Sequence, residues 1–226
     1  MTASPLPVLP DGRLASGIAH LALRYRGRFS PETIQPLVSD SYEPLAEHAR
    51  IRTHLVVLAE HLATERLDAL AHIEGAPGSG LPRVLFVRSL PHARTTSRGG
   101  TPIAGRSQMA AALLDHRAGG HVVVSSAGTH PAAEVEPVVA QVLTEAGVDL
   151  TDAFPKPLTD EVVQAADIFI TMGCGDACPI VPGRRLLDWL VTDPEGAPVA
   201  VVRGIRDEID AHITELLDSL PSTSTT

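Results

Sequence analysis

The sequence predicts an α/β protein in which a small three-helix bundle precedes a four-stranded parallel sheet flanked by helices. In the first third of the chain, apolar residues recur at three- and four-residue steps, which is typical of helices. After a glycine- and proline-rich stretch, short apolar runs alternate with amphipathic segments, as in parallel sheets. The residues that suggest chemistry come directly after the apolar runs, where ligands of such sheets bind.

The first expected helix lies in "SGIAHLALRYRG", and the third lies in "HLVVLAEHLATERLDALAHI". Between them, Ser30 is a favourable N-cap, Pro31 suits the first helical position, and Glu32 suits the positive end of the helix dipole. The chain is therefore expected to divide into a helical bundle, a linker, an α/β domain and a disordered tail, at residues 1–75, 76–82, 83–220 and 221–226.

Four strands are expected in the α/β domain, from the runs "RVLFV", "HVVVSSAG", "DIFITMG" and "RRLLDWLV". Helices are expected after or between them, near residues 107–116, 132–146, 160–165 and 201–220. Four loops follow the strands, namely residues 88–106, "SAGT", "TMGCGDACP" and "TDPEG". Because the carboxyl ends of parallel strands share one edge of the sheet, these loops are expected to meet at one crevice.

The composition excludes several classes of protein. A net charge of −9 disfavours nucleic acid and acidic membranes as partners. No apolar run is long enough to span a membrane, and no secretory signal is recognisable. Two cysteines in 226 residues favour a reducing compartment, so a cytoplasmic protein is expected. No metal site is expected, since the histidines of the bundle are typical of an exposed helix face.

The segment "AGRSQMAAALL" is suited to binding an anion. Gly105 lets the backbone approach a ligand closely, and Arg106 offers a planar fork to a tetrahedral oxyanion. A helix that begins at Ser107 adds free N–H groups and the positive end of its dipole. An oxyanion site formed by Ala104, Gly105, Arg106 and Ser107 is the hypothesis, and an ordinary strand–loop–helix turn is the alternative.

Four motifs together resemble the arsenate reductases of the low-molecular-weight tyrosine phosphatase fold. They are "VLFV…AGRSQMAAALL", "SSAGTHP", "TMGCGDACP" and "DWLVTDPEG", in the same order. The N-terminal helical unit is similar to that of some actinobacterial members. The resemblance implies arsenical resistance through reduction of arsenate to arsenite by a thiol cosubstrate, either mycothiol or a thioredoxin- or glutaredoxin-like protein. It implies no bound cofactor, and it makes arsenate or a phosphate-like oxyanion the ligand.

The nucleophile of that family does not match. Its members carry a cysteine, then five residues, then the arginine, but here the place of the cysteine is Gly100, and the residue directly after the strand core is Arg88. The segment between strand and arginine is also about a dozen residues longer than the resemblance implies, and Ile103 replaces the Asn typical of the reductases. Residues 88–103 are open to two explanations, a genuine insertion or a frame-shifted reading of GC-rich DNA.

The resemblance assigns the remaining roles. Asp193 corresponds to an aspartate that protonates the leaving group. Cys174 and Cys178 lie in the region where additional cysteines take over oxidation in thioredoxin-linked relatives, so they are the candidate redox residues. Two reduced, inherited cysteines without a redox role are the alternative. The sequence thus predicts an arsenate reductase-like protein with an altered catalytic loop. The alternative is a non-catalytic oxyanion-binding or interaction protein derived from such a phosphatase.

Overall fold

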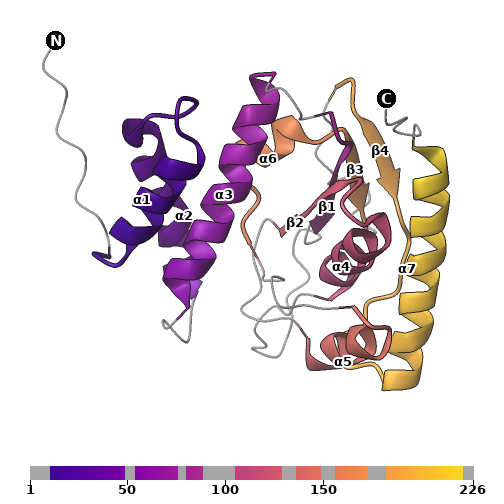
Figure 1. Ribbon diagram of the computed structural model, residues 1–226. Helices are drawn as coiled ribbons and strands as arrows, with labels where there is room; N and C mark the ends of the chain where they lie inside the picture. Colours follow the sequence, from indigo (N-terminus) through magenta and orange to yellow (C-terminus); the bar gives the residue numbers. More distant parts are fainter. Residues whose placement is uncertain are drawn as a thin grey trace, which may run out of the picture. The chain divides into compact units, whose positions relative to one another are not determined.

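The computed structural model describes residues 11–48, 54–75, 80–88, 105–128, 136–148, 156–172 and 182–220. These residues form two compact units (Figure 1). The first comprises Met1–Ser79 together with Thr159–Ala165, and the second comprises Gly80–Leu158 together with Ala166–Thr226. Among the helices described, none has the length and hydrophobicity needed to cross a membrane.

The first unit contains the three helices expected from the periodicity, α1 (Leu14–Arg24), α2 (Pro31–His48) and α3 (Leu55–Ile73). The start of α2 follows the sequence signal, because the backbone N–H groups of Thr33 and Ile34 donate to the Ser30 carbonyl at 3.0 Å. The helix then continues through Pro36 and Pro44, each of which lacks an N–H for the helical ladder.

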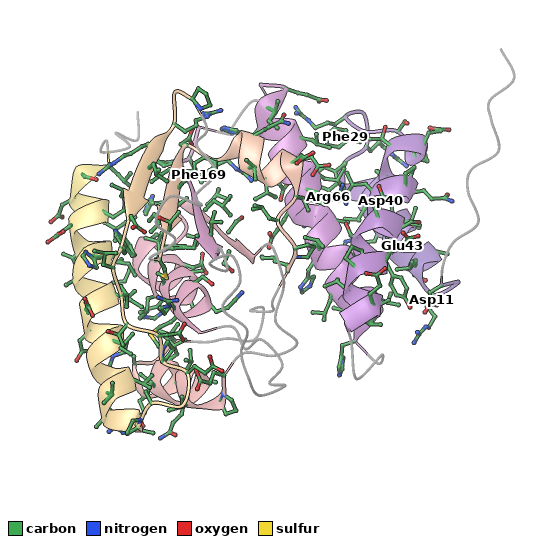
Figure 2. All side chains as sticks on the ribbon, turned by 180° about the vertical axis from the view of Figure 1, so that it is seen from behind. Asp11, Phe29, Asp40, Glu43, Arg66 and Phe169 are labelled. Atoms are coloured by element: carbon green, nitrogen blue, oxygen red, sulfur yellow. The ribbon has the colours of Figure 1, made fainter. Side chains whose placement is uncertain are left out.

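A fourth helix, α6 (Asp160–Ala165), joins this first unit although it lies far along the chain. Arg66 on α3, labelled in Figure 2, donates to the two carboxylate oxygens of Glu161 at 2.8 and 3.3 Å. Its guanidinium also donates to the Leu37 carbonyl and to the Ser41 hydroxyl of α2. Arg66 therefore ties α6 to both α2 and α3. That the helical bundle and the α/β domain fold separately stays a prediction.

The second unit is built on a parallel sheet with the strand order β2-β1-β3-β4, as expected. Its strands are β1 (Arg83–Arg88), β2 (Val123–Gly128), β3 (Ile168–Thr171) and β4 (Arg185–Asp188). Its helices are α4 (Arg106–Ala118), α5 (Pro137–Glu145) and α7 (Val199–Ser219). The strands share a direction, so β1, β2, β3 and β4 all end at one edge of the sheet. The predicted α/β fold is confirmed.

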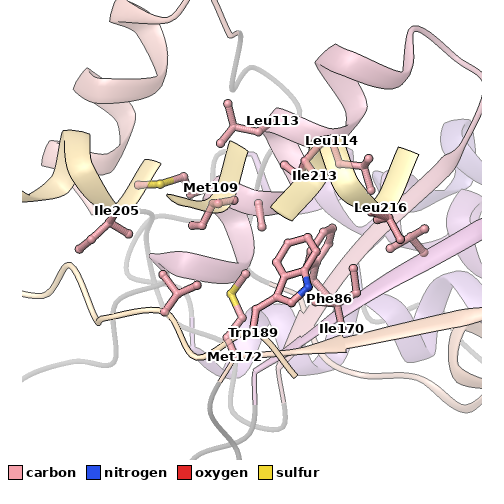
Figure 3. Close-up of a cluster of buried hydrophobic side chains, with 14 of the residues drawn as sticks. Phe86, Met109, Leu113, Leu114, Ile170, Met172, Trp189, Ile205, Ile213 and Leu216 are labelled. Carbon is pink, nitrogen blue, oxygen red and sulfur yellow. The ribbon is translucent and has the colours of Figure 1, made fainter. Parts of the chain in front are cut away.

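One face of the sheet carries the hydrophobic core against α4, α5 and α7 (Figure 3). Phe86 of β1 and Ile170 of β3 are fully buried, and the ring of Phe86 lies 5.6 Å from that of Trp189. Helix α7 supplies one apolar stripe at three- and four-residue spacing, made of Val202, Ile205, Ile209, Ile213 and Leu216. This core holds the carboxyl edge of the sheet and the starts of α4 and α5 in one unit.

Candidate oxyanion site

The first turn of α4 contains the arginine that the sequence predicts to bind an oxyanion. Helix α4 begins at Arg106, one residue earlier than expected, and Gly105 is its N-cap without a side-chain hydrogen bond. The Gly105 carbonyl accepts from the Met109 N–H at 2.9 Å, which closes the first helical turn. The N–H groups at a helix start have no partner within the helix, so this end of α4 favours a negative charge.

Arg106 meets the candidate acid Asp193. Its Nη2 donates to Asp193 Oδ2 at 2.9 Å, and its Nη1 donates to the Val191 carbonyl at 2.7 Å. The other carboxylate oxygen, Oδ1, accepts from the Glu195 N–H at 3.2 Å. Two residues that the sequence proposed for one site are thus brought into direct contact, with the guanidinium held by the loop after β4.

The side chains of this pair differ in exposure. Arg106 is 22% exposed and Asp193 is 48% exposed, so solvent reaches the carboxylate more readily than the guanidinium. A guanidinium has five N–H groups, and these two contacts use two of them. An oxyanion that reached Arg106 would therefore meet a cation already shared with a carboxylate.

The chain approaches itself closely at Gly105. A β-carbon added there would lie 2.7 Å from Cγ of Pro194, which is closer than real β-carbons come to any atom. The glycine is therefore required for packing, because the turn that carries Asp193 lies directly on the start of α4. The sequence suggested that Gly105 lets the backbone come close to a ligand. The structure shows that Gly105 also lets the backbone come close to Pro194.

Glu136 also contacts the turn that carries Asp193, and the sequence did not identify this residue. It is the N-cap of α5, it is only 8% exposed, and its Oε1 accepts from the Gly196 N–H at 3.2 Å. Burial raises the pKa of Glu136; the Gly196 hydrogen bond opposes this rise, while the negative charges of Asp193 and Glu195 add to it. The only sequence signal was an acidic residue before Pro137, which resembles an ordinary helix start.

The ends of β3 and β4 are joined beside the predicted redox loop. Thr171 is buried at the end of β3, and its hydroxyl donates to Asp188 Oδ1 at 2.6 Å and lies 3.3 Å from the Leu187 carbonyl. Three residues further along the chain comes Cys174. This contact joins the end of β4 to the end of β3, after which the segment with Cys174 follows in the sequence.

Several predicted site residues lie outside the described residues. Ala104, Cys174 and Cys178 are among them, as is Gly100. Arg88 is the last residue of β1 and pairs in register with Gly128 at the end of β2. Ser107 is described and is 6% exposed in the first turn of α4. In the part of the chain that is described, no cluster of three His, Cys, Asp or Glu side chains could hold a metal ion.

Comparison with known proteins assigns both parts of the chain. Residues 14–71 match the family "Protein-tyrosine-phosphatase-like, N-terminal domain", and residues 101–225 match "Low molecular weight phosphotyrosine protein phosphatase". Strand β1 and residues 89–100 fall between the two matched segments.

Individual relatives are arsenate reductases. The structure of the thioredoxin-dependent arsenate reductase of Corynebacterium glutamicum is 46% identical and covers 93% of this chain and 97% of its own, with a TM-score of 0.75. Arsenate reductase 1 of Bacillus cereus is 32% identical over 118 residues, which are 50% of this chain and 87% of the relative. The glutaredoxin arsenate reductase of Synechocystis is 27% identical over 115 residues, again 50% and 87%. The chain therefore belongs to the low molecular weight phosphotyrosine protein phosphatase family, and within it is similar to the arsenate reductases, as its four motifs predicted.

Proposed function

We propose that this arsenate reductase-like chain binds arsenate at the start of α4, between Ala104 and Ser107. The observation that carries the proposal is the Arg106–Asp193 pair, since it places a bidentate cation and an acid side by side at a helix start. Asp193 is proposed as the proton donor to the departing oxygen. Arsenate is preferred over a phosphate ester because the three relatives described above are named arsenate reductases.

Reduction would run through the loop after β3. Converting arsenate to arsenite adds two electrons to arsenic and removes one oxygen as water. Two thiols supply those electrons when their sulfur atoms form one disulfide, and their two protons leave with the oxygen. Cys174 is the proposed attacking thiol, and Cys178 or an external thiol completes the disulfide. A thiol system recycles it, either mycothiol or a protein of the thioredoxin or glutaredoxin kind. We also propose a cytoplasmic location, where thiols stay reduced.

A non-catalytic oxyanion-binding or interaction protein is the second candidate. It is favoured by one sequence fact, that neither cysteine lies between β1 and Arg106. Losing the nucleophile of a hydrolytic site costs on the order of 10⁶ in turnover. Arg106 and Asp193 alone can orient and protonate an oxyanion, but they cannot form the covalent intermediate. We therefore expect arsenate reduction to be weak or absent.

Coupled arsenate reduction distinguishes the two candidates. The assay is run with mycothiol, thioredoxin and glutaredoxin systems on wild type, Cys174→Ser and Cys178→Ser. Any activity is expected to vanish in Cys174→Ser and to fall in Cys178→Ser. Robust activity in Cys174→Ser would show that another nucleophile acts. Arsenate binding without turnover in all three proteins would support the non-catalytic candidate.

A further inference from the structure

Glu136 is a buried carboxylate at a helix start. It lies at the N-cap of α5 with extended backbone angles, φ −63° and ψ 128°, and its own carbonyl accepts from the N–H groups of Val139 and Ala140. Its side chain does not cap the helix and is directed instead to the Gly196 N–H. A buried carboxylate that leaves its own helix start for another segment indicates a role at that segment.

The segment it contacts is the turn that carries the candidate acid. Gly196 is three residues beyond Asp193, and Asp193 itself accepts from the Glu195 N–H inside the same turn. The second oxygen of Glu136, Oε2, would lie 3.7 Å from a β-carbon built on Gly105. Glu136 thus lies between two neighbours, the turn at residues 193–196 and the N-cap of α4.

We propose that Glu136 is a positioning residue for the oxyanion site: it holds the turn at residues 193–196 against Gly105, so that Asp193 stays within reach of Arg106. This inference rests on the proposed function, in which Arg106 and Asp193 handle the oxyanion. Pro194 of this turn packs directly against Gly105, and Glu136 at the start of α5 accepts a hydrogen bond from Gly196 of the same turn. The Gly196 hydrogen bond thus ties the turn to α5, in addition to the contacts that Arg106 and Pro194 make with the start of α4.

The charge of Glu136 adds a second effect. The charged groups that act on it among the described residues are Asp193 and Glu195, both acidic. A bound oxyanion would add another negative charge nearby and would favour the protonated carboxyl. Wild-type affinity for an oxyanion is therefore expected to rise as the pH falls through the raised pKa of Glu136.

Glu136→Gln and Glu136→Ala separate position from charge. Glutamine keeps an acceptor for the Gly196 N–H but has no charge, whereas alanine removes both. Glu145→Ala is the matched control, because Glu145 ends the same helix and pairs with Arg203 at a distance from this turn. We expect Glu136→Ala to weaken sulfate binding about tenfold by calorimetry, because the released turn no longer holds the Arg106 guanidinium in place. Glu136→Gln keeps the turn and lacks the charge, so it should bind sulfate at least as tightly as wild type. Glu145→Ala should bind within about twofold of wild type. The Glu136→Gln affinity should also lose the rise at low pH attributed to this carboxyl.

A readout without any ligand tests the same inference. In wild type, the Gly196 amide resonance is expected to shift as the Glu136 carboxyl titrates, and this shift should be absent in Glu136→Gln. The inference is overturned if the Gly196 amide does not follow that titration, or if Glu136→Ala binds sulfate as tightly as Glu145→Ala. Absence of sulfate and arsenate binding by wild type, with the amide titration intact, would instead contradict the proposed function and leave Glu136 as the residue that positions the turn.

Discussion

Arg106 and Asp193 lie 87 positions apart in the sequence, and their side chains form an ion pair of 2.9 Å at the start of α4. The guanidinium that should receive an oxyanion is thus already partnered by a carboxylate. A dianion entering this site must share Arg106 with Asp193 or displace it. The pair therefore sets a cost on oxyanion binding, while it keeps the proposed acid Asp193 beside the arginine.

Removing the negative charge of Asp193 is expected to strengthen oxyanion binding. In Asp193→Asn the amide keeps the shape of the side chain, but Arg106 no longer shares its charge with a carboxylate. Calorimetry with sulfate should show affinity rising roughly three- to tenfold in Asp193→Asn. Arg106→Ala should lose most of the heat of sulfate binding. Equal affinity in wild type and Arg106→Ala would show that the oxyanion does not bind at this arginine.

Gly105→Ala is expected to destabilise the second unit and to weaken sulfate binding. The added β-carbon would lie 2.7 Å from Pro194 and must displace the turn that carries Asp193. Overpacking of this kind costs about 1–3 kcal/mol. Gly204→Ala in α7 is the control, because a β-carbon there meets nothing within 4 Å and alanine suits a helix interior. Chemical denaturation should rank Gly204→Ala above wild type and Gly105→Ala below it. The opposite order would contradict the close contact with Pro194.

The N-terminal bundle is predicted to be dispensable for folding of the sheet, but α6 should depend on it. Arg66 holds Glu161 from α3; burial raises the pKa of Glu161, yet the hydrogen bonds from Arg66 and the Glu161 backbone N–H outweigh this and lower it. A fragment that starts at Gly78 should therefore unfold cooperatively while residues 160–165 lose their amide protection. Hydrogen exchange on the fragment and the full chain measures this. An insoluble or molten fragment would show that both units share one core.

The Glu145–Arg203 pair should stabilise the second unit at neutral pH and lose this effect only in strong acid. Two hydrogen bonds from Arg203, at 2.8 and 2.9 Å, lower the pKa of Glu145 to about 2. A carboxyl whose pKa is lowered on folding stabilises the folded state when the pH lies above its ordinary pKa. This contribution is lost as the pH falls towards the lowered pKa. Carboxyl NMR should show the Glu145 pKa returning towards its ordinary value in Arg203→Ala. An unchanged value would mean that the pair does not form in solution.

Periodicity and turn residues predicted most of the fold, because they report local preferences. The start of α2 at Ser30 and Pro31 follows from capping chemistry, and the alternation of strands and helices fixed the class of sheet. The continuation of α2 through Pro36 and Pro44 could not be predicted, because a proline inside a helix lacks the N–H for the ladder and usually kinks or ends the helix. The neighbouring Leu37, Val38 and Leu45 are buried, a packing contribution that local sequence preferences do not report.

The site was predictable only in part, for a similar reason. Arg106 and Asp193 are carried by recognisable motifs, so the sequence named them. The attachment of α6 to α3 and the reach of Glu136 to Gly196 both depend on contacts between distant segments. Neither residue type nor local spacing reveals such contacts. Buried carboxylates that lie outside a motif are the residues that sequence reasoning misses here.

The last prediction concerns the missing nucleophile. Wild type is expected to show no detectable hydrolysis of p-nitrophenyl phosphate, because neither Arg88 nor Gly100 can attack phosphorus. The thiol must lie close to an oxyanion that the helix-start amides and Arg106 hold. In the family, a spacing of five residues between the cysteine and the arginine meets that demand. Gly100→Cys restores this spacing, whereas Arg88→Cys restores only the position after the strand. We therefore expect Gly100→Cys to hydrolyse p-nitrophenyl phosphate at a rate roughly tenfold or more above the assay background, and Arg88→Cys to stay at that background like wild type.

Two controls make that result specific. Gly99→Cys carries the same thiol one position away and should stay inactive, and Gly100→Cys combined with Arg106→Ala should lose the gain. The added thiol should also react with iodoacetate faster than a free cysteine, because a helix start and an arginine favour the thiolate. Activity in Arg88→Cys but not in Gly100→Cys would show that the thiol belongs at the end of β1, and that the long segment before Arg106 folds away from the oxyanion site. Activity in neither variant, with sulfate binding retained, would show that the altered loop keeps a thiol out of reach of the anion even when the sequence supplies one.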